Sequence, residues 1–156
     1  MTGDDLREVM RRFPVPVAVV TGVDEREEFG LTVASLVSLS LEPPLVGVSI
    51  GKESARHEPM RNAGAFAASL LSAEQAHLAQ HFARSGVPLV ALWKGVPTRS
   101  GKHGPLLEGA LAWLECRTWA EYDAGDHTLF LGEVESMELG RPGLGLVYRD
   151  STYHPA

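Results

Sequence analysis

The stretch GLTVASLVSLSLEPP occupies residues 30–44 and does most to decide the fold class. Residues 30–41 are rich in β-branched and aliphatic side chains with interspersed Thr and Ser, a composition typical of strands. Pro43 and Pro44 interrupt this pattern, and residues 45–50 resume it as an apolar run. The stretch therefore predicts two strands separated by a proline turn.

Strand patterns continue outward from this stretch in both directions. Residues 15–21 form an earlier β-branched run, and an acidic hairpin tip separates it from residue 30. Further strands are predicted at the ranges 65–71, 110–122, 129–139 and 144–149. Because strands and helices do not alternate, the pattern favours an antiparallel barrel over a doubly wound parallel sheet. We expect one domain over residues 1–156, mainly β with short helices.

The short helices are predicted from spacing and caps. Apolar residues recur with helical spacing within residues 4–13, at Leu6, Val9, Met10 and Phe13. Residues 51–62 predict a turn into a short helix that is interrupted or ends near Pro59. Ser72 and Gln75 have the spacing of a capping box, which predicts a helix through Phe82.

The glycine- and proline-rich segment 85–105 is expected to be a long surface loop. Loops of that length are usually functional or mobile.

Composition excludes several classes of function. The formal net charge is −6, and no cluster of Lys and Arg exists to neutralise phosphates, which argues against nucleic-acid binding. Cys116 is the only cysteine and lies in an apolar run, so we expect an inert buried thiol. The first residues lack a signal-peptide core, and no membrane-spanning run follows. A cytoplasmic protein is the expectation.

Several motifs resemble known sites but have the wrong spacing. Residues 47–52 approach a P-loop, yet three residues separate the glycines and Glu53 follows the lysine. His77 and His81 are four residues apart, but no third metal ligand is evident and we expect no metal. No nucleophile elbow of the Gly-x-Ser-x-Gly type occurs.

Hydroxyl and small residues form two groups that suit a flat polar ligand with a phosphate. The first group, within residues 32–38, offers close backbone approach and donors, although an ordinary strand pair with a polar outer face explains it as well. The second group follows a strand and precedes a short helix; its members are Ser49, Gly51, Lys52, Ser54 and Arg56. Hydroxyls, free backbone N–H groups and a cation are what a phosphate requires, but a solvated turn would look the same.

Beyond these groups, three separated motifs resemble the flavin reductase-like, FMN-binding split-barrel family. They are FPVPVAVVT at residues 13–21, the segment 30–54, and GDHTLFLGEV at residues 125–134. PLLEGALAWLEC at residues 105–116 also resembles a late strand of that family. The resemblance covers nearly the whole chain in order, and the family includes small reductase components of two-component flavin monooxygenases.

The resemblance implies an antiparallel split β-barrel and a homodimer that binds FMN, or in some members FAD. It implies that Thr32, Val33, Ala34 and Ser35 contact the isoalloxazine and that Ser38 lies near the ribityl chain. It further implies a phosphate site with either Lys52 or Arg56 as its cation, formed by Ser49, Ile50, Gly51, Lys52, Ser54 and Arg56.

The resemblance also places His127 as the catalytic residue, near the nicotinamide and flavin, although a turn histidine bonded to backbone is an alternative. Phe82 either packs near the cofactor or serves the core. Val15-Pro16 and the C-terminal segment 146–153 depart from the family pattern, which leaves Tyr153 uncertain as a flavin neighbour.

The implied activity is that of an NAD(P)H-dependent flavin oxidoreductase supplying reduced flavin to a separate monooxygenase. Because the cofactor performs the difficult chemistry, the lack of a paired-carboxylate or triad motif is consistent with it. The negative charge favours NADH, and the sequence leaves NADPH open. The alternatives are an electron-transfer flavoprotein that retains FMN, a non-enzymatic flavin carrier, and a pyridoxamine-phosphate-type oxidase on the same barrel.

Overall fold

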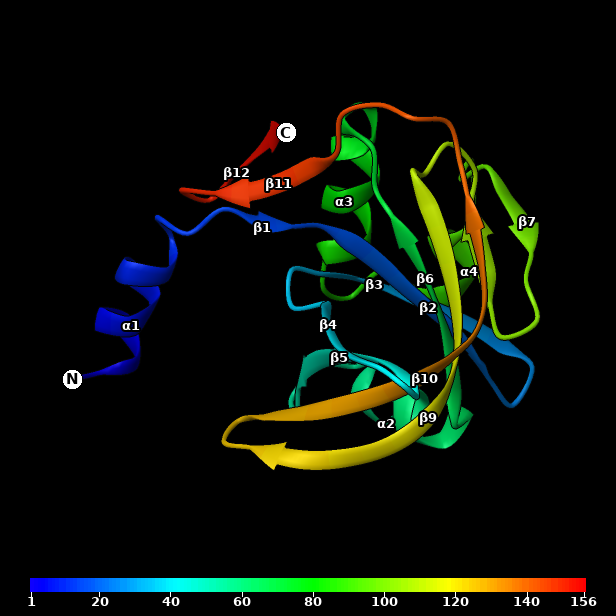
Figure 1. Ribbon diagram of the computed structural model, residues 1–156, viewed down its shortest axis with the longest axis horizontal. Coiled ribbons are helices and arrows are strands. Elements are labelled where there is room, and N and C mark those ends of the chain that lie inside the picture. Colours follow the sequence, from blue (N-terminus) through cyan, green and yellow to red (C-terminus); the bar gives the residue numbers. More distant parts are fainter.

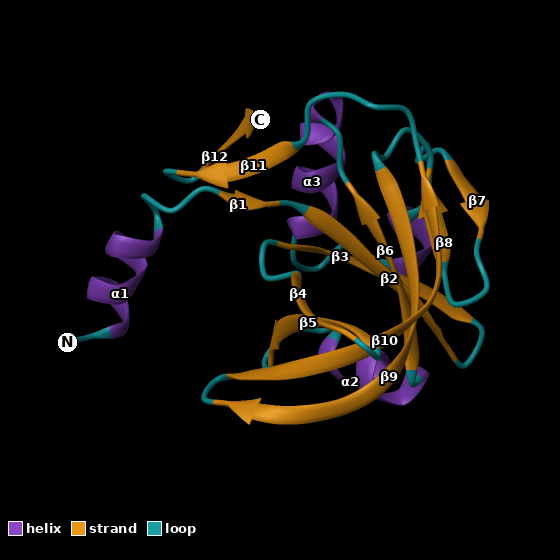
Figure 2. Cartoon of the chain, viewed as in Figure 1, coloured by secondary structure: helices purple, strands orange, loops and turns teal.

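The computed structural model describes residues 1–156 and is mainly β with short helices, as expected (Figures 1 and 2). The helices are α1 (Gly3–Met10), α2 (His57–Ala63), the 3₁₀ turn η1 (Ala73–Gln75), α3 (Ala76–Ala83) and α4 (Leu89–Leu92). The strands are β1 (Val15–Pro16), β2 (Ala18–Asp24), β3 (Glu27–Val33), β4 (Val37–Leu41), β5 (Pro44–Gly51), β6 (Ala65–Leu70), β7 (Thr98–Ser100), β8 (Pro105–Leu107), β9 (Ala112–Ala124), β10 (His127–Leu139), β11 (Leu146–Arg149) and β12 (Thr152–Pro155). None of the helices is both long and apolar enough to cross a membrane.

One seven-stranded sheet organises the chain, in the order β3-β2-β6-β9-β10-β5-β4. Every neighbouring pair in it is antiparallel, which confirms the sequence prediction. The long strands β9 and β10 cross the middle and curve strongly, so the two ends of the sheet turn toward each other (Figure 1). The edge strands β3 and β4 do not pair, and the barrel stays open between them.

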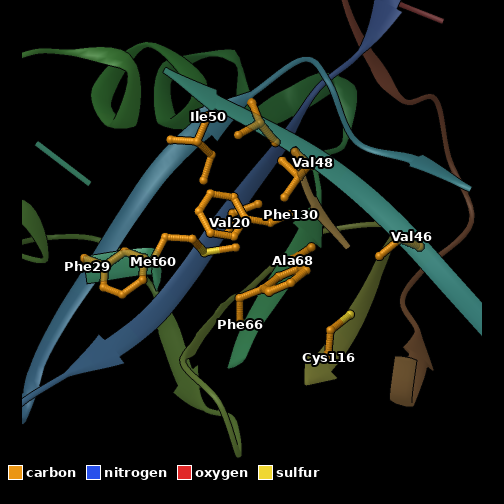
Figure 3. Packing of buried hydrophobic residues seen from close by; sticks show 12 residues of the cluster. Val20, Phe29, Val46, Val48, Ile50, Met60, Phe66, Ala68, Cys116 and Phe130 are labelled. Atoms are coloured by element: carbon orange, nitrogen blue, oxygen red, sulfur yellow. The ribbon is translucent and has the colours of Figure 1, made fainter. Parts of the chain in front are cut away.

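Strand β2 is buried on both faces, because alternate side chains enter two different cores. Ala18 and Val20 point into the curled sheet, where they meet Phe66 and Phe130 (Figure 3). Val17, just before the strand, and Val19 point the other way, into a second core. This two-sided burial explains why the segment is a continuous apolar run rather than an alternating one.

The second core attaches α3 to the outside of the sheet. Leu78, Ala79 and Phe82 are its buried residues from α3. The predicted capping box begins this helical segment, because the Ser72 N–H donates to the Gln75 side-chain oxygen at 3.0 Å. Met60 of α2 is fully buried among the side chains of the inner core (Figure 3).

The structure corrects three details of the sequence analysis. Pro59 lies inside the first turn of α2 rather than ending a helix, because the N–H groups of a first turn have no helical partner to lose. Segment 85–105 is not wholly irregular, since it contains α4 and β7. Strand β12 was not predicted; it pairs with β11 through a turn at Asp150 and Ser151, both with positive φ.

Helix α1 occupies the range expected from its apolar spacing, yet it buries nothing. It projects from the body of the protein (Figure 1), and all of its residues are exposed. Thr2 caps its start, accepting a hydrogen bond from the Asp5 N–H at 3.1 Å. The apolar side chains Leu6, Val9 and Met10 are therefore left without a partner in this chain.

Candidate functional site

A cavity of about 370 Å³ opens where three distant segments of the chain meet. One wall is the end of β3 with the loop after it, a second is the end of β5 with the following turn, and the third is the start of β10. The lining residues are Leu31, Thr32, Val33, Ala34, Ser35, Ser49, Ile50, Gly51, Ser54 and His127. Nine of these ten were predicted as site residues from the sequence; Leu31 was not.

The Ser35 hydroxyl joins two of these walls across the open edge of the sheet. It donates to the carbonyl oxygen of Ser49 at 3.0 Å and accepts from the N–H of the same residue at 3.0 Å. Strand β4 begins only at Val37, so the outer backbone groups of Ser49 have no strand partner there. The side chain of Ser35 supplies the missing partner and fixes the width of the cavity.

Thr32 fixes the same wall to the outer helix. Its hydroxyl donates to the carbonyl oxygen of Ala79 in α3 at 2.6 Å. The proton is therefore engaged, and the oxygen can only accept hydrogen bonds from a ligand. Val33 and Ile50 are buried, so they contribute mainly backbone to the cavity.

His127 begins β10 and pairs across the ladder with Gly51. Its Nδ1 lies 2.7 Å from Oδ1 of Asp126, and its side chain is 47 % exposed. This hydrogen bond is the main reason that the pKa of Asp126 is lowered. Because an ionised carboxylate can only accept, Nδ1 carries the hydrogen, and Nε2 is the free nitrogen beside Gly51.

The segment after β5 carries two cations, Lys52 and Arg56, and the sequence left open which of them would bind a phosphate. The Lys52 ammonium pairs with Asp123 at 2.9 Å, which lowers the pKa of that carboxyl group, and Lys52 does not line the cavity. Arg56 belongs to none of the ion pairs in the structure and lines an adjoining cavity of about 680 Å³. Of these two cations, Arg56 is therefore the one that remains available to an anionic ligand.

The adjoining cavity shares Leu31, Thr32 and Ser54 with the first, so the two form one groove. Its far wall is the end of α3 and the loop that follows, including Arg84. Apart from Phe82, sequence reasoning missed these wall residues, although the length of segment 85–105 had indicated a functional or mobile loop. Phe82 contributes to the wall but is 96 % buried and packs on Trp93, with ring centroids 5.2 Å apart.

Ser38 and Lys52 are the two predicted site residues that do not line this groove. Ser38 lies on the far side of it. It is exposed on β4 and borders a separate apolar hollow with Leu36 and Val46.

Cys116 takes no part in the groove either. It is fully buried in the inner core, and burial, reinforced by the charges of Glu135 and Glu115, raises the pKa of its thiol to about 12. The predicted inert thiol is confirmed.

The groups in the groove suit binding more than acid–base catalysis. The first cavity is lined by hydroxyls, backbone and one imidazole, and no carboxylate or thiol lines it. A flat, uncharged ring could stack against such walls and receive hydrogen bonds at its edge. The adjoining cavity adds Arg56 and the Ser54 hydroxyl, which suit an anion attached to that ring.

Comparison with known proteins gives this geometry a context. Residues 10–156 match the family described as "Flavin reductase like domain". The chain is 39 % identical over 147 residues to the reductase component of 4-hydroxyphenylacetate 3-monooxygenase from Thermus thermophilus, covering 94 % of this chain and 92 % of the relative. It is 43 % identical over 132 residues to an NADH-dependent FAD reductase from Streptomyces globisporus, covering 83 % and 72 % of the two chains.

Solved structures of flavin reductases also resemble this chain in fold and sequence. The flavin reductase component of a bacterial two-component tryptophan halogenase superposes with a TM-score of 0.91 at 34 % identity, covering 99 % of this chain and 98 % of the other. An NADH:FAD oxidoreductase of Streptomyces globisporus, solved with NAD and FAD fragments, gives 0.90 at 37 % identity, with coverage of 97 % and 90 %.

The bridging role of Ser35 is testable without any ligand. Ser35→Ala leaves the N–H and carbonyl of Ser49 without their partner, and we expect a loss of about 1–2 kcal/mol in the free energy of unfolding. Ser38→Ala removes an exposed hydroxyl that makes no such bridge, and should change stability by less than about 0.5 kcal/mol. Urea denaturation of the ligand-free protein measures both, and equal effects would contradict the bridge.

Proposed function

This chain belongs to the flavin reductase like domain family, and from that premise we propose how its groove binds flavin and directs the reaction. The protein is an NAD(P)H-dependent flavin oxidoreductase that uses FMN or FAD. The observation that carries the assignment of the site is the cavity itself, which collects residues 31–35, 49–51, 54 and 127 from three separate segments. A flavin held by these residues would supply the acceptor for hydride from the nicotinamide, and the walls of the cavity would orient the two rings.

The walls of the first cavity would hold the ring. Residues 32–35 and Ser49–Gly51 face it largely with small side chains and backbone, which allows close approach of a planar group. Backbone N–H groups along this wall would donate to the polar edge of the ring and stabilise negative charge there. The Ser35 bridge keeps these donors in place before any ligand arrives.

The phosphate would lie in the adjoining cavity, close to Ser54 and Arg56. Arg56 is half-buried and unpaired, and arginine binds phosphate with two parallel hydrogen bonds. Lys52 is engaged by Asp123, so of the two cations that the sequence offered we assign Arg56.

His127 would position the nicotinamide at the mouth of the first cavity. Its exposed side chain is held by Asp126, and this hydrogen bond sets both the ring orientation and the free Nε2. An imidazole held in this way can accept a hydrogen bond from a carboxamide or carry a proton to and from solvent.

The rival functions differ from reduction in measurable ways. An electron-transfer flavoprotein would retain its flavin and turn over little free FMN, and a carrier would bind flavin without reacting with nicotinamides. The open groove is more consistent with exchange of flavin, and several relatives are named as reductase components of monooxygenases. We therefore infer that the reduced flavin is delivered to a separate monooxygenase in the cytoplasm, where NAD(P)H is available.

The activity itself is tested under anaerobic conditions. NADH, and in a second experiment NADPH, is added to the protein with excess FMN while the flavin absorbance is followed. We expect rapid bleaching of all the FMN. Bleaching should be faster with NADH, because Arg56 and Arg84 are the only Lys or Arg side chains that line the groove, and the additional phosphate of NADPH would compete with the flavin phosphate for them. Bound flavin that does not bleach with either donor would contradict the function and favour the carrier.

The role of His127 is tested by His127→Ala. Loss of nicotinamide positioning should slow hydride transfer about tenfold or more, with little change in the Kd of FMN. Stopped-flow reduction under saturating FMN measures the rate. His103→Ala is the matched control, because that histidine pairs with Glu135 outside the groove and should leave the rate unchanged. A loss of twofold or less for His127→Ala would remove it from the mechanism.

We also propose a homodimer, because two apolar surfaces lack a partner within the chain. One is the projecting helix α1, and the other is the edge strand β4, with Val37, Leu39 and Leu41 exposed. Beside β4 lies an apolar hollow of about 440 Å³. An exposed apolar edge strand invites pairing with another chain, and a second copy would cover it.

Leu41→Glu tests the dimer without disturbing the core, since Leu41 is 89 % exposed. Placing a charge in a buried interface should shift the protein from dimer to monomer at micromolar concentration. Val90 is 90 % exposed on α4, outside both surfaces, so Val90→Glu should remain a dimer. Sedimentation velocity distinguishes the species, and a monomeric wild-type protein would contradict the proposal.

A further inference from the structure

His57 is a buried histidine to which the proposed reaction gives no part. It is the first residue of α2, and 5 % of it is exposed. Its Nε2 lies 2.8 Å from the hydroxyl oxygen of Thr128, a residue 71 positions further along the chain. Its ring packs with an edge toward Phe130, and the ring centroids are 5.8 Å apart. His57 therefore joins the start of α2 to β10 from inside the protein.

The segment that precedes His57 carries Ser54 and Arg56, which line the adjoining cavity. Its hydrogen bonds are local: the Ser54 N–H donates to the carbonyl oxygen of Gly51 at 3.0 Å, and the Arg56 N–H donates to the Ser54 hydroxyl at 3.1 Å. The His57 N–H then donates to the carbonyl oxygen of Ser54 at 3.1 Å. The positions of Ser54 and Arg56 consequently depend on how the two ends of this segment are held.

Both ends of the segment are held against β10. At one end Gly51 pairs with His127 in the ladder, and at the other end His57 contacts Thr128. Thr128 directly follows His127, and successive side chains of a strand point to opposite faces. Thr128 is accordingly buried, whereas His127 lines the ring cavity, the first of the two cavities of the groove. The start of one strand thus fixes both His127 and the segment that carries Ser54 and Arg56.

Packing alone does not require an imidazole at this position. Met60 is fully buried in the inner core and already attaches α2 to the sheet (Figure 3). An apolar side chain would fill the space beside Phe130 without needing a polar partner. The Glu58 carboxylate lies 3.4 Å from Nδ1 of His57, and because a carboxylate can only accept, it assigns the hydrogen to Nδ1. Nε2 then accepts from the Thr128 hydroxyl, so this contact has a defined direction that alkyl packing lacks.

We propose that His57 is a positioning residue for the flavin phosphate, and that its hydrogen bond to Thr128 holds Ser54 and Arg56 where the phosphate binds. This inference rests on the proposed function, which places the phosphate beside those two residues. His57 lines neither cavity of the groove, so it acts through the segment that it ends. Its loss should weaken the binding of the phosphate and leave the binding of the isoalloxazine ring unchanged.

The test compares FMN with riboflavin, because the two share the ring and the ribityl chain and differ by the phosphate. Quenching of flavin fluorescence gives both Kd values. Since hydrogen bonds to charged groups are the strong ones, the wild-type protein should bind FMN at least about tenfold more tightly than riboflavin. His57→Leu and Thr128→Val should each lower that preference about fivefold, the effect of one ordinary hydrogen bond, while the Kd of riboflavin stays within about twofold.

Conservative variants separate the hydrogen bond from packing. His57→Gln keeps a polar group in reach of the hydroxyl and Thr128→Ser keeps the hydroxyl itself, so both should retain most of the preference for FMN. Combining His57→Leu with Thr128→Val should cost no more than either change alone, because each removes the same bond. His103→Leu is the matched control, since the Nε2 of His103 contacts Glu135 outside the groove, and it should leave both Kd values unchanged.

The inference is overturned if His57→Leu and Thr128→Val keep the full preference for FMN, or if the affinities for FMN and riboflavin fall together, as a general loss of structure would cause. Should His57→Leu fail to fold, Thr128→Val decides alone, because valine matches threonine in shape and suits a strand. Reduction of FMN by NADH is a separate readout. A wild-type protein whose preference for FMN depends on His57 but that reduces no flavin contradicts the proposed function and leaves the role of His57 intact.

Discussion

The pair of hydrogen bonds between Ser35 and Ser49 is the contact on which the rest of the site depends. The seven-stranded sheet curls until its ends approach, but β3 and β4 do not pair, so the ladder provides no closure there. One side chain completes the backbone hydrogen bonding of β5 at this gap. The gap is consequently held open at a fixed width, and a cavity lined by backbone and small residues exists because two strands do not meet.

The groove, in turn, depends on β2 being buried on both sides. Its inward residues help to fill the curled sheet, and its outward residues hold α3 on the surface. Thr32 fastens the same helix to β3 through the carbonyl of Ala79. One face of α3 thus anchors the helix, and the C-terminal end of the helix lies in the wall of the adjoining cavity.

Local sequence signals predicted much of this, and tertiary contacts decided the remainder. The strand at 45–50 was predictable because it is an apolar run, whereas the predicted strand 15–21 is divided into β1 and β2, which belong to different sheets. The family resemblance grouped residues 32–35, 49–51, 54 and 127, and they line one cavity. Sequence could not decide whether Lys52 or Arg56 is the available cation, because the answer depends on the ion pair between Lys52 and Asp123 at the end of β9.

Ser38 lies on the exposed side of β4, and no spacing rule indicates that the strand turns it away from the groove. Strand β12 escaped prediction because its turn uses Asp and Ser at positive φ where glycine or asparagine would have been the signal.

The distribution of reactive groups fits a protein that positions its ligands rather than one that attacks them. The one thiol is sealed in the core with a pKa of about 12, so it remains protonated and cannot act as a nucleophile at neutral pH. Asp123 and Asp126, at the turn beside the groove, have lowered pKa values because each is engaged by a cation or an imidazole. They stay ionised well below neutral pH and are unsuited to act as general acids. The groups that line the groove are hydroxyls, backbone N–H groups, two arginines and the exposed carboxylate of Glu53. Those groups bind and orient, so differences in rate between variants should arise from geometry at the ring cavity, and differences in ligand preference from the arginines beyond it.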